Sequence, residues 1–188
     1  MKVFFLASNA ADKNLRASYK KIVQALRSEG NEVFYQQPLP PTEEIEKMPK
    51  KKSEMRAKEF LRDMLQCDCV VFDGTRSTTG GGYYLCMALQ HSLPVLYLTQ
   101  NEYRGLYIAS SNRLLKIKRY YTTKQDELKN TILDFLKFAN KKKLSNRFNL
   151  MISDSMDGFL NKVSQDYGTS KADFIRDLIY TKMEKIDK

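Results

Sequence analysis

The stretch CDCVVFDGTRSTTGGGYYLCMALQHSLPVLYL, residues 67–98, carries the signals that decide the fold. CVVFD within it is a continuous apolar run typical of a strand buried on both faces, and PVLYLT, residues 94–99, is a second such run. Between them, a turn rich in Thr and Gly leads into a helix that we expect over residues 82–91. A strand, a crossover helix and another strand favour a parallel sheet.

The same alternation of strands and helices continues on both sides of this stretch. Further apolar runs predict strands at KVFFLA, EVFYQ and LLKIKRYY. Apolar residues at helical spacing predict helices over residues 12–29, 53–66 and 124–139. Residues 36–52 are charged and rich in Pro, so we expect an exposed loop there. The predicted fold class is therefore α/β, a Rossmann-like parallel five-stranded sheet flanked by helices.

The turn after CVVFD is suited to binding an anion, because unpaired amides and the helix dipole favour negative charge at a helix start. The candidate ligand- or phosphate-binding residues are Asp73, Thr75, Thr78, Thr79, Gly80, Gly81 and Gly82. A tight turn that needs glycine only for close packing would have the same composition. The residues of the turn leave both interpretations open.

Residues 1–139 resemble the nucleoside 2-deoxyribosyltransferase superfamily, which includes the deoxynucleoside monophosphate N-glycosidases. The matching segments are SYKKIVQALRSEGNEV, FLRDMLQCDCVVFD and GGGYYLCMAL, followed by PVLYL. The resemblance implies a nucleotide or nucleoside-type ligand, with Thr78 at the position of the family's phosphate-contacting hydroxyl. It also implies that the family's nucleophilic glutamate and its helix aspartate correspond to Tyr84 and Phe60.

Neither Tyr84 nor Phe60 has a carboxylate that could act as the nucleophile or as the supporting acid. A phenol, with an ordinary pKa of about 10, is a poor nucleophile unless a base lies beside it. Asp73 is a candidate base by its position in the sequence, and Glu59 and Asp63 are the carboxylates nearest to Phe60. We therefore expect no catalytic residue, and a degenerate pseudoenzyme domain that keeps its binding groups.

Residues 146–188 form a second segment, predicted as one strand followed by two helices. In RFNLMIS, residues 147–153, every second residue is apolar, so a strand would bury one face and display the other. Asp154 or Ser155 is expected to cap the first helix, Gly168 to end it, and Thr169 or Ser170 to begin the second. So little apolar surface cannot fold alone, which implies an intertwined dimer built around Phe148, Leu150 and Ile152.

This second segment resembles a ribbon-helix-helix DNA-binding domain of the Arc type, in which paired strands enter the major groove. The resemblance implies base contacts by Arg147, Asn149 and Met151. It also implies contacts to DNA phosphates by Gly168, Thr169, Ser170 and Lys171. A helical hairpin used only for dimerisation is the simpler alternative.

Composition limits the remaining possibilities. The formal charge is +10, from 32 basic and 22 acidic residues, and such an excess attracts polyanions. No apolar run approaches the roughly 20 residues of a membrane span, so we expect a cytoplasmic protein. The three cysteines lack zinc-type spacing and His is present once, so we expect no metal and no cofactor.

Two domains are expected, residues 1–139 and 146–188, joined by a linker over 140–145. The favoured function is a dimeric, sequence-specific DNA-binding protein, acting as a transcriptional regulator, with a degenerate nucleotide-binding domain. One alternative is an active nucleoside or nucleotide N-glycosidase or deoxyribosyltransferase whose tail serves oligomerisation. Another is an antitoxin-like or defence-associated interaction protein.

Overall fold

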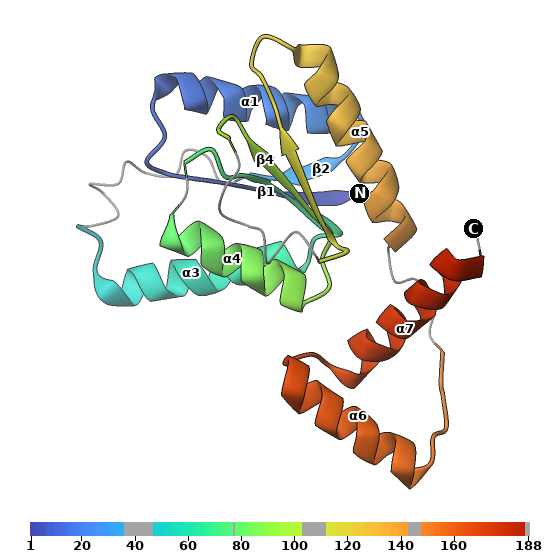
Figure 1. Cartoon of the computed structure of the whole chain (residues 1–188). Coiled ribbons are helices and arrows are strands. Elements are labelled where there is room, and N and C mark those ends of the chain that lie inside the picture. Colours follow the sequence, from blue (N-terminus) through green and yellow to red (C-terminus); the bar gives the residue numbers. More distant parts are fainter. Residues whose placement is uncertain (36–46, 77, 103–111, 143–147, 187–188) are drawn as a thin grey trace. The chain divides into compact units, whose positions relative to one another are not determined.

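A computed structural model describes the chain except residues 36–46, 77, 103–111, 143–147 and 187–188. The chain divides into two compact units, Met1–Lys143 and Leu144–Lys188. A sheet covered by helices makes up the first unit, and a pair of helices makes up the second (Figure 1).

The first unit is built on a fully parallel sheet, as predicted. Its strands are β1 (Lys2–Ala7), β2 (Glu32–Phe34), β3 (Cys69–Asp73), β4 (Val95–Thr99) and β5 (Leu115–Arg119). Their order in the sheet is β2-β1-β3-β4-β5, and every neighbouring pair is parallel. The three central strands are buried almost throughout, which is why they read as continuous apolar runs.

Helices cover both faces of this sheet (Figure 1). The helices are α1 (Lys13–Ser28), α3 (Lys50–Leu65), α4 (Thr79–Gln90) and α5 (Gln125–Lys142). Phe5 and Val71 pack against α1 and α5, whereas their neighbours Phe4 and Val70 pack against α3 and α4. The period of two along each strand therefore produces two separate cores. No helix in the described part of the chain is long and apolar enough to cross a membrane.

Two helices have ends that differ from those predicted from the sequence. Helix α4 begins at Thr79 rather than Gly82, because the Thr78 side chain accepts a hydrogen bond from the Gly81 amide and caps the helix. Helix α5 continues to Lys142, so the first residues of the predicted linker are helical.

The second unit contains α6 (Asp154–Tyr167) and α7 (Lys171–Ile186). Gly168 ends α6 with a left-handed φ of 60°, as predicted from the sequence. The cap of α6 is Ser153 rather than Asp154 or Ser155, since its side chain accepts from the Met156 amide.

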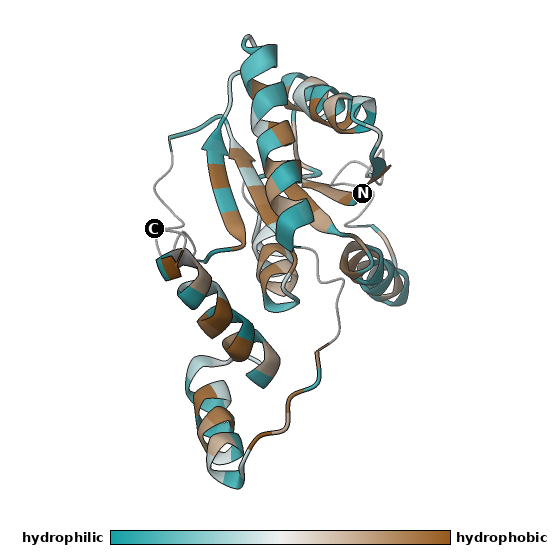
Figure 2. Cartoon of the chain, turned by 90° about the vertical axis from the view of Figure 1, so that its right-hand side faces the viewer, coloured by the Kyte–Doolittle hydropathy of each residue, from teal (hydrophilic) through white to brown (hydrophobic). Residues whose placement is uncertain are grey.

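The strand predicted at residues 147–153 is not formed in the single chain. Arg147 lies outside the described residues, and residues 148–153 form neither helix nor strand. Phe148 and Leu150 are 83% and 56% exposed, and Figure 2 shows the hydrophobic colour of the segment that precedes α6. A strand requires a neighbour for its backbone hydrogen bonds, and the described part of one chain provides none here.

Candidate functional site

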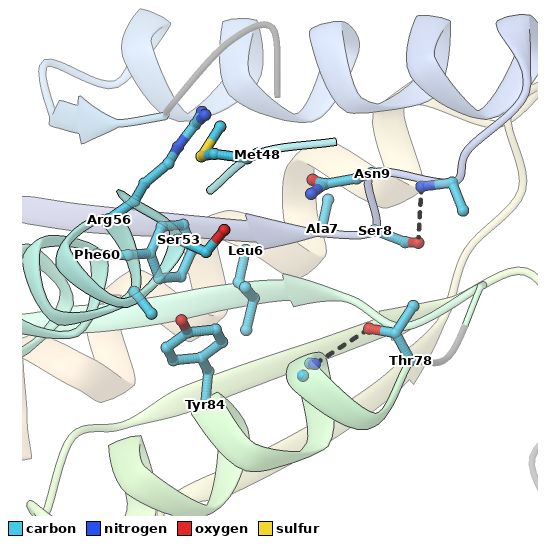
Figure 3. Close-up of a pocket in the computed structure, with 14 residues that line it drawn as sticks. Leu6, Ala7, Ser8, Asn9, Met48, Ser53, Arg56, Phe60, Thr78 and Tyr84 are labelled. Atoms are coloured by element: carbon cyan, nitrogen blue, oxygen red, sulfur yellow. Dashed lines mark hydrogen bonds between the residues drawn. The ribbon is translucent and has the colours of Figure 1, made fainter. Parts of the chain in front are cut away.

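The sheet order places a crevice at the carboxyl ends of β1 and β3. The chain leaves β1 toward β2 on one side and leaves β3 toward β4 on the other, so the connections diverge between these two strands. Ligands of open parallel sheets bind at such switch points. A cavity of about 350 Å³ lies there (Figure 3). It is lined by Leu6, Ala7, Ser8, Asn9, Ala10, Met48, Ser53, Arg56, Ala57, Phe60, Thr78, Gly80, Gly81 and Tyr84.

The start of α4 forms one wall of the cavity and keeps three of the predicted residues together. Thr78 Oγ1 accepts from the Gly81 amide over 3.1 Å, which closes the first turn of the helix. A Cβ on Gly81 would come within 2.8 Å of the Phe72 ring, so the close approach of helix and strand requires glycine. Gly80 and Gly82 have open space instead. The glycine turn therefore serves packing at Gly81, while the helix start also faces a cavity.

Asp73 does not line the cavity. Its side chain is fully buried and accepts hydrogen bonds from the Tyr120 hydroxyl, over 2.5 Å, and from the Thr75 amide, over 2.9 Å. Burial raises the pKa of this carboxyl, and the hydrogen bonds from Tyr120 and Thr75 partly oppose that increase.

Thr75 belongs to the same hydrogen-bond network, which is only partly buried at this residue, rather than to the cavity wall. Thr75 Oγ1 accepts from the Gln100 amide, and its carbonyl accepts from the Asn101 side chain over 2.7 Å. Gln100 in turn donates to the Tyr120 hydroxyl over 2.7 Å. The network fixes the turn that leads from β3 to α4. Thr79 and Gly82, also predicted as binding residues, are exposed and do not line the cavity.

Tyr84 and Phe60 meet in the cavity wall between α4 and α3. Their ring centroids lie 4.6 Å apart at an interplanar angle of 51°. Phe60 also packs edge-on against Phe4, with centroids 4.8 Å apart, so it belongs to the core beneath the cavity. Burial, and secondarily Tyr83, raises the pKa of Tyr84 above its ordinary value. The Tyr84 phenol is therefore protonated at neutral pH and is able to donate a hydrogen bond.

The cavity also contains polar residues that the sequence analysis did not select. Asn9 follows β1, and its Oδ1 atom is buried without a hydrogen-bond partner among the described residues. Ser53 and Arg56 come from α3, at the helical spacing that also brings Ala57 and Phe60 to the cavity. The signal available in the sequence was the position of Ser8 and Asn9 directly after a buried strand.

Some of the predicted DNA-contacting residues of the second unit are exposed, and others already have partners within the unit. Asn149 and Met151 are exposed, and Met151 is 97% exposed. Lys171 forms an ion pair with Asp157 over 2.6 Å, so its charge is already partnered within the helical pair. Ser170 accepts from the Asp173 amide and donates to its carboxylate, which caps α7. Gly168 and Thr169 supply the end of α6.

Comparison with known proteins finds two similar sequences, both from Methanosarcina. No protein-family model matches the chain. It is 27% identical over 140 residues to a Methanosarcina mazei protein named "Putative 2′-deoxynucleoside 5′-phosphate N-hydrolase 1", covering 72% of this chain and 83% of the relative. A Methanosarcina barkeri protein of the same name is 29% identical over 143 residues, covering 72% and 84%.

A solved structure, 2-deoxyribosyltransferase from Bacillus psychrosaccharolyticus, superposes with a TM-score of 0.50 at 16% identity, covering 69% of this chain and 91% of the transferase. The first unit has a deoxyribosyltransferase-like fold. At this identity the superposition establishes the fold alone. The sequence-based expectation of this fold for most of the chain is thereby confirmed.

The predicted function of a DNA-binding regulator with a degenerate domain is contradicted by these comparisons. The similar proteins are named as N-hydrolases, and the protein of similar fold is a deoxyribosyltransferase. They favour the alternative, a nucleoside or nucleotide N-glycosidase or transferase. A seven-residue alternation near the C-terminus is a weaker indicator of function than the unit that makes up most of the chain.

Proposed function

We propose that the first unit binds a nucleoside 5′-phosphate and hydrolyses its N-glycosidic bond. The observation that carries the proposal is the capped, glycine-rich start of α4 opening directly onto an apolar cavity at the β1/β3 switch point. The phosphate is assigned to the helix start, where unpaired amides favour an anion. The sugar and base are assigned to the cavity, which falls in the usual size range of small-molecule sites.

Two further observations support a ligand of this kind. The first turn of α4 contains no acidic residue, so no side chain there competes with a phosphate. The buried Oδ1 atom of Asn9 lacks a hydrogen-bond donor among the described residues, and a sugar hydroxyl would supply one. The names of the Methanosarcina relatives agree with a 2′-deoxynucleoside 5′-phosphate as substrate.

The composition of the cavity favours hydrolysis over transfer. Deoxyribosyl transfer needs an intermediate in which a side chain holds the sugar, and a carboxylate is suited to that role. None of the described residues that line the cavity is Asp or Glu. In the proposed reaction a water oxygen bonds to C1′ as the C1′–N bond breaks, the electron pair leaves with the base, and a proton from the water ends on the base. The protonated Tyr84 phenol is assigned to hydrogen bonding with that water or the sugar.

The test is to incubate the full chain with 2′-deoxynucleosides and with their 5′-phosphates, and to separate free base and sugar phosphate by chromatography. We expect base release from the phosphates and much weaker release from the nucleosides. Thr78→Val should lower affinity for the phosphates more than for the nucleosides, since Thr78 shapes the helix start. Thr123→Val, at an exposed turn, is the matched control.

Three results would contradict this proposal, each in a different way. Failure of every 5′-phosphate to bind would remove the assigned ligand. Tight binding without base release would remove the hydrolytic reaction. Equal release from nucleosides and phosphates would contradict the assignment of the phosphate to α4.

We further propose that the second unit is of the ribbon-helix-helix type and pairs with a second copy of this chain. Among its described residues only Leu160 and Val163 are hydrophobic and buried. Large apolar side chains remain exposed on Phe148, Leu150, Met151, Ile152, Met156, Phe159, Leu178, Ile179, Met183 and Ile186. Two helices with so small a core need another subunit for stability. Sedimentation of the full chain as a monomer with a folded second unit would contradict this pairing.

A further inference from the structure

Arg56 is the one cationic side chain among the described residues that line the cavity. It lies on the inner face of α3, one helical turn before Phe60 and one turn after Ser53, both of which also line the cavity. The residue is half-buried. The α3 helix therefore brings a charged group to a wall that is otherwise mostly apolar.

The guanidinium of Arg56 has no hydrogen bond or ion pair among the described residues. Glu59, three positions later on the same helix, borders a neighbouring hollow together with Arg56, yet the two form no ion pair. A partly buried charge without a partner is unfavourable unless water or a ligand supplies acceptors. Arginine presents its donors as a rigid planar fork and has no acceptor, so a matching ligand group must offer acceptors side by side.

Arg56 and Met48 lie on the opposite side of the cavity from Thr78, with Phe60 and Tyr84 along the wall that joins the two sides (Figure 3). A nucleotide whose phosphate is at Thr78 would therefore direct its base toward α3. The aromatic and thioether side chains would contact the base faces, and Arg56 would meet the base edge.

We propose that Arg56 selects a base with two adjacent hydrogen-bond acceptors on the edge remote from the sugar. This inference rests on the proposed function. Among the common bases guanine meets the requirement, because O6 and N7 are neighbouring acceptors far from the glycosidic nitrogen. Adenine has a donor amino group beside N7, which would face the Arg56 donors. The paired acceptors of cytosine include O2, which is next to the glycosidic nitrogen and points back toward the sugar.

The experiment measures equilibrium binding of 2′-deoxyguanosine 5′-phosphate and 2′-deoxyadenosine 5′-phosphate, which share phosphate and sugar. The proteins compared are the full-length wild type, Arg56→Met, Arg56→Lys and Arg62→Met. Arg62 lies on the same helix but is exposed and pairs with Asp63, so its replacement is the matched control. Circular dichroism and thermal unfolding establish that each variant is folded.

We expect the wild type to bind the guanine nucleotide roughly five- to a hundredfold more tightly than the adenine nucleotide, as for one bidentate contact. Arg56→Met should remove that preference by weakening guanine binding, without weakening adenine binding, because the opposed donors are removed. Arg56→Lys should restore charge but little preference, because it lacks the fork. Arg62→Met should behave as the wild type.

The possible failures are distinguishable. Equal binding of the two nucleotides by the wild type would overturn the role of Arg56 and leave the proposed function standing. An equal loss of both in Arg56→Met, rescued by Arg56→Lys, would mean that Arg56 serves the phosphate and would also overturn the inference. Absence of binding by any nucleotide would contradict the proposed function itself.

Discussion

The ring of Tyr84 rests against the ring of Phe60, with centroids 4.6 Å apart and an interplanar angle of 51°. This contact joins α3 to α4 through apolar packing, and the Tyr84 side chain also contributes a hydroxyl to the cavity wall. Tyr84 therefore combines a packing role with a polar group that a ligand can reach.

Replacing Tyr84 separates these two effects. Tyr84→Phe keeps the ring against Phe60 and removes the hydroxyl, so base release should fall by at least about tenfold with nucleotide affinity little changed. Tyr84→Glu supplies a carboxylate near C1′ and should increase base release by about a hundredfold. Steady-state assays with folded variants measure both effects. Unchanged release by Tyr84→Phe would exclude the hydroxyl from the reaction.

Gly81 and Gly82 offer a comparison of packing within one helical turn. Gly81→Ala would place a methyl group 2.8 Å from the Phe72 ring and should lower the free energy of unfolding by about 1–3 kcal/mol. Gly82→Ala meets nothing within 4 Å and should raise it by roughly 0.5–1 kcal/mol through reduced backbone entropy. Urea unfolding of both variants measures the difference. Equal effects would show that Phe72 moves aside readily.

The buried carboxyl of Asp73 should make stability depend on pH. Its raised pKa means that the folded protein holds this proton more tightly than the unfolded chain does. The unfolding free energy should therefore fall as pH rises from the ordinary value of 3.8 through the raised pKa, and then level off. Asp73→Asn cannot titrate and should lack this part of the decline. Denaturant unfolding of the wild type and of Asp73→Asn across that pH range measures how the unfolding free energy depends on pH. If the two proteins show the same pH dependence, the prediction is wrong.

Pairing through the second unit can be tested by charges on alternate residues. Leu150→Asp would place a carboxylate in the proposed shared core, at a cost of roughly a few kcal/mol for each chain. The chain should then sediment as a monomer. Met151→Asp, one residue further and already 97% exposed, should leave the assembly intact. If both variants stay paired, or both dissociate, the proposed inward face is wrong.

The fold was predictable from the sequence because strands buried on both faces appear as apolar runs, and crossovers between parallel strands have a preferred hand. KVFFLA, CVVFD and PVLYLT each correspond to a strand of the sheet. Whether the segment around Leu150 forms a strand was harder to predict. A strand needs a neighbouring strand, and the alternation of apolar residues does not specify that neighbour.

The candidate site was predictable only in part. The glycine turn and Thr78 were found because a helix start has a local signature. Asp73 was assigned to the ligand because it ends a strand, but its partner Tyr120 lies 47 residues away, and that contact turns the carboxylate into the interior. Arg56 and Asn9 were missed for the same reason, because tertiary packing alone brings α3 and the end of β1 to one cavity.

The basic residues of strand β5, at one edge of the sheet, bear on aggregation of the protein at high concentration. Strand β5, LKIKR, is the edge strand of the sheet that the described residues form, and it displays Lys116, Lys118 and Arg119 at exposed positions. Open strand edges invite fibrous aggregation, and a row of like charges opposes the approach of the same edge from another molecule. These three cations are therefore expected to oppose pairing of the β5 edge with the same edge of another molecule. Neutralising these three cations would be expected to produce turbidity on warming.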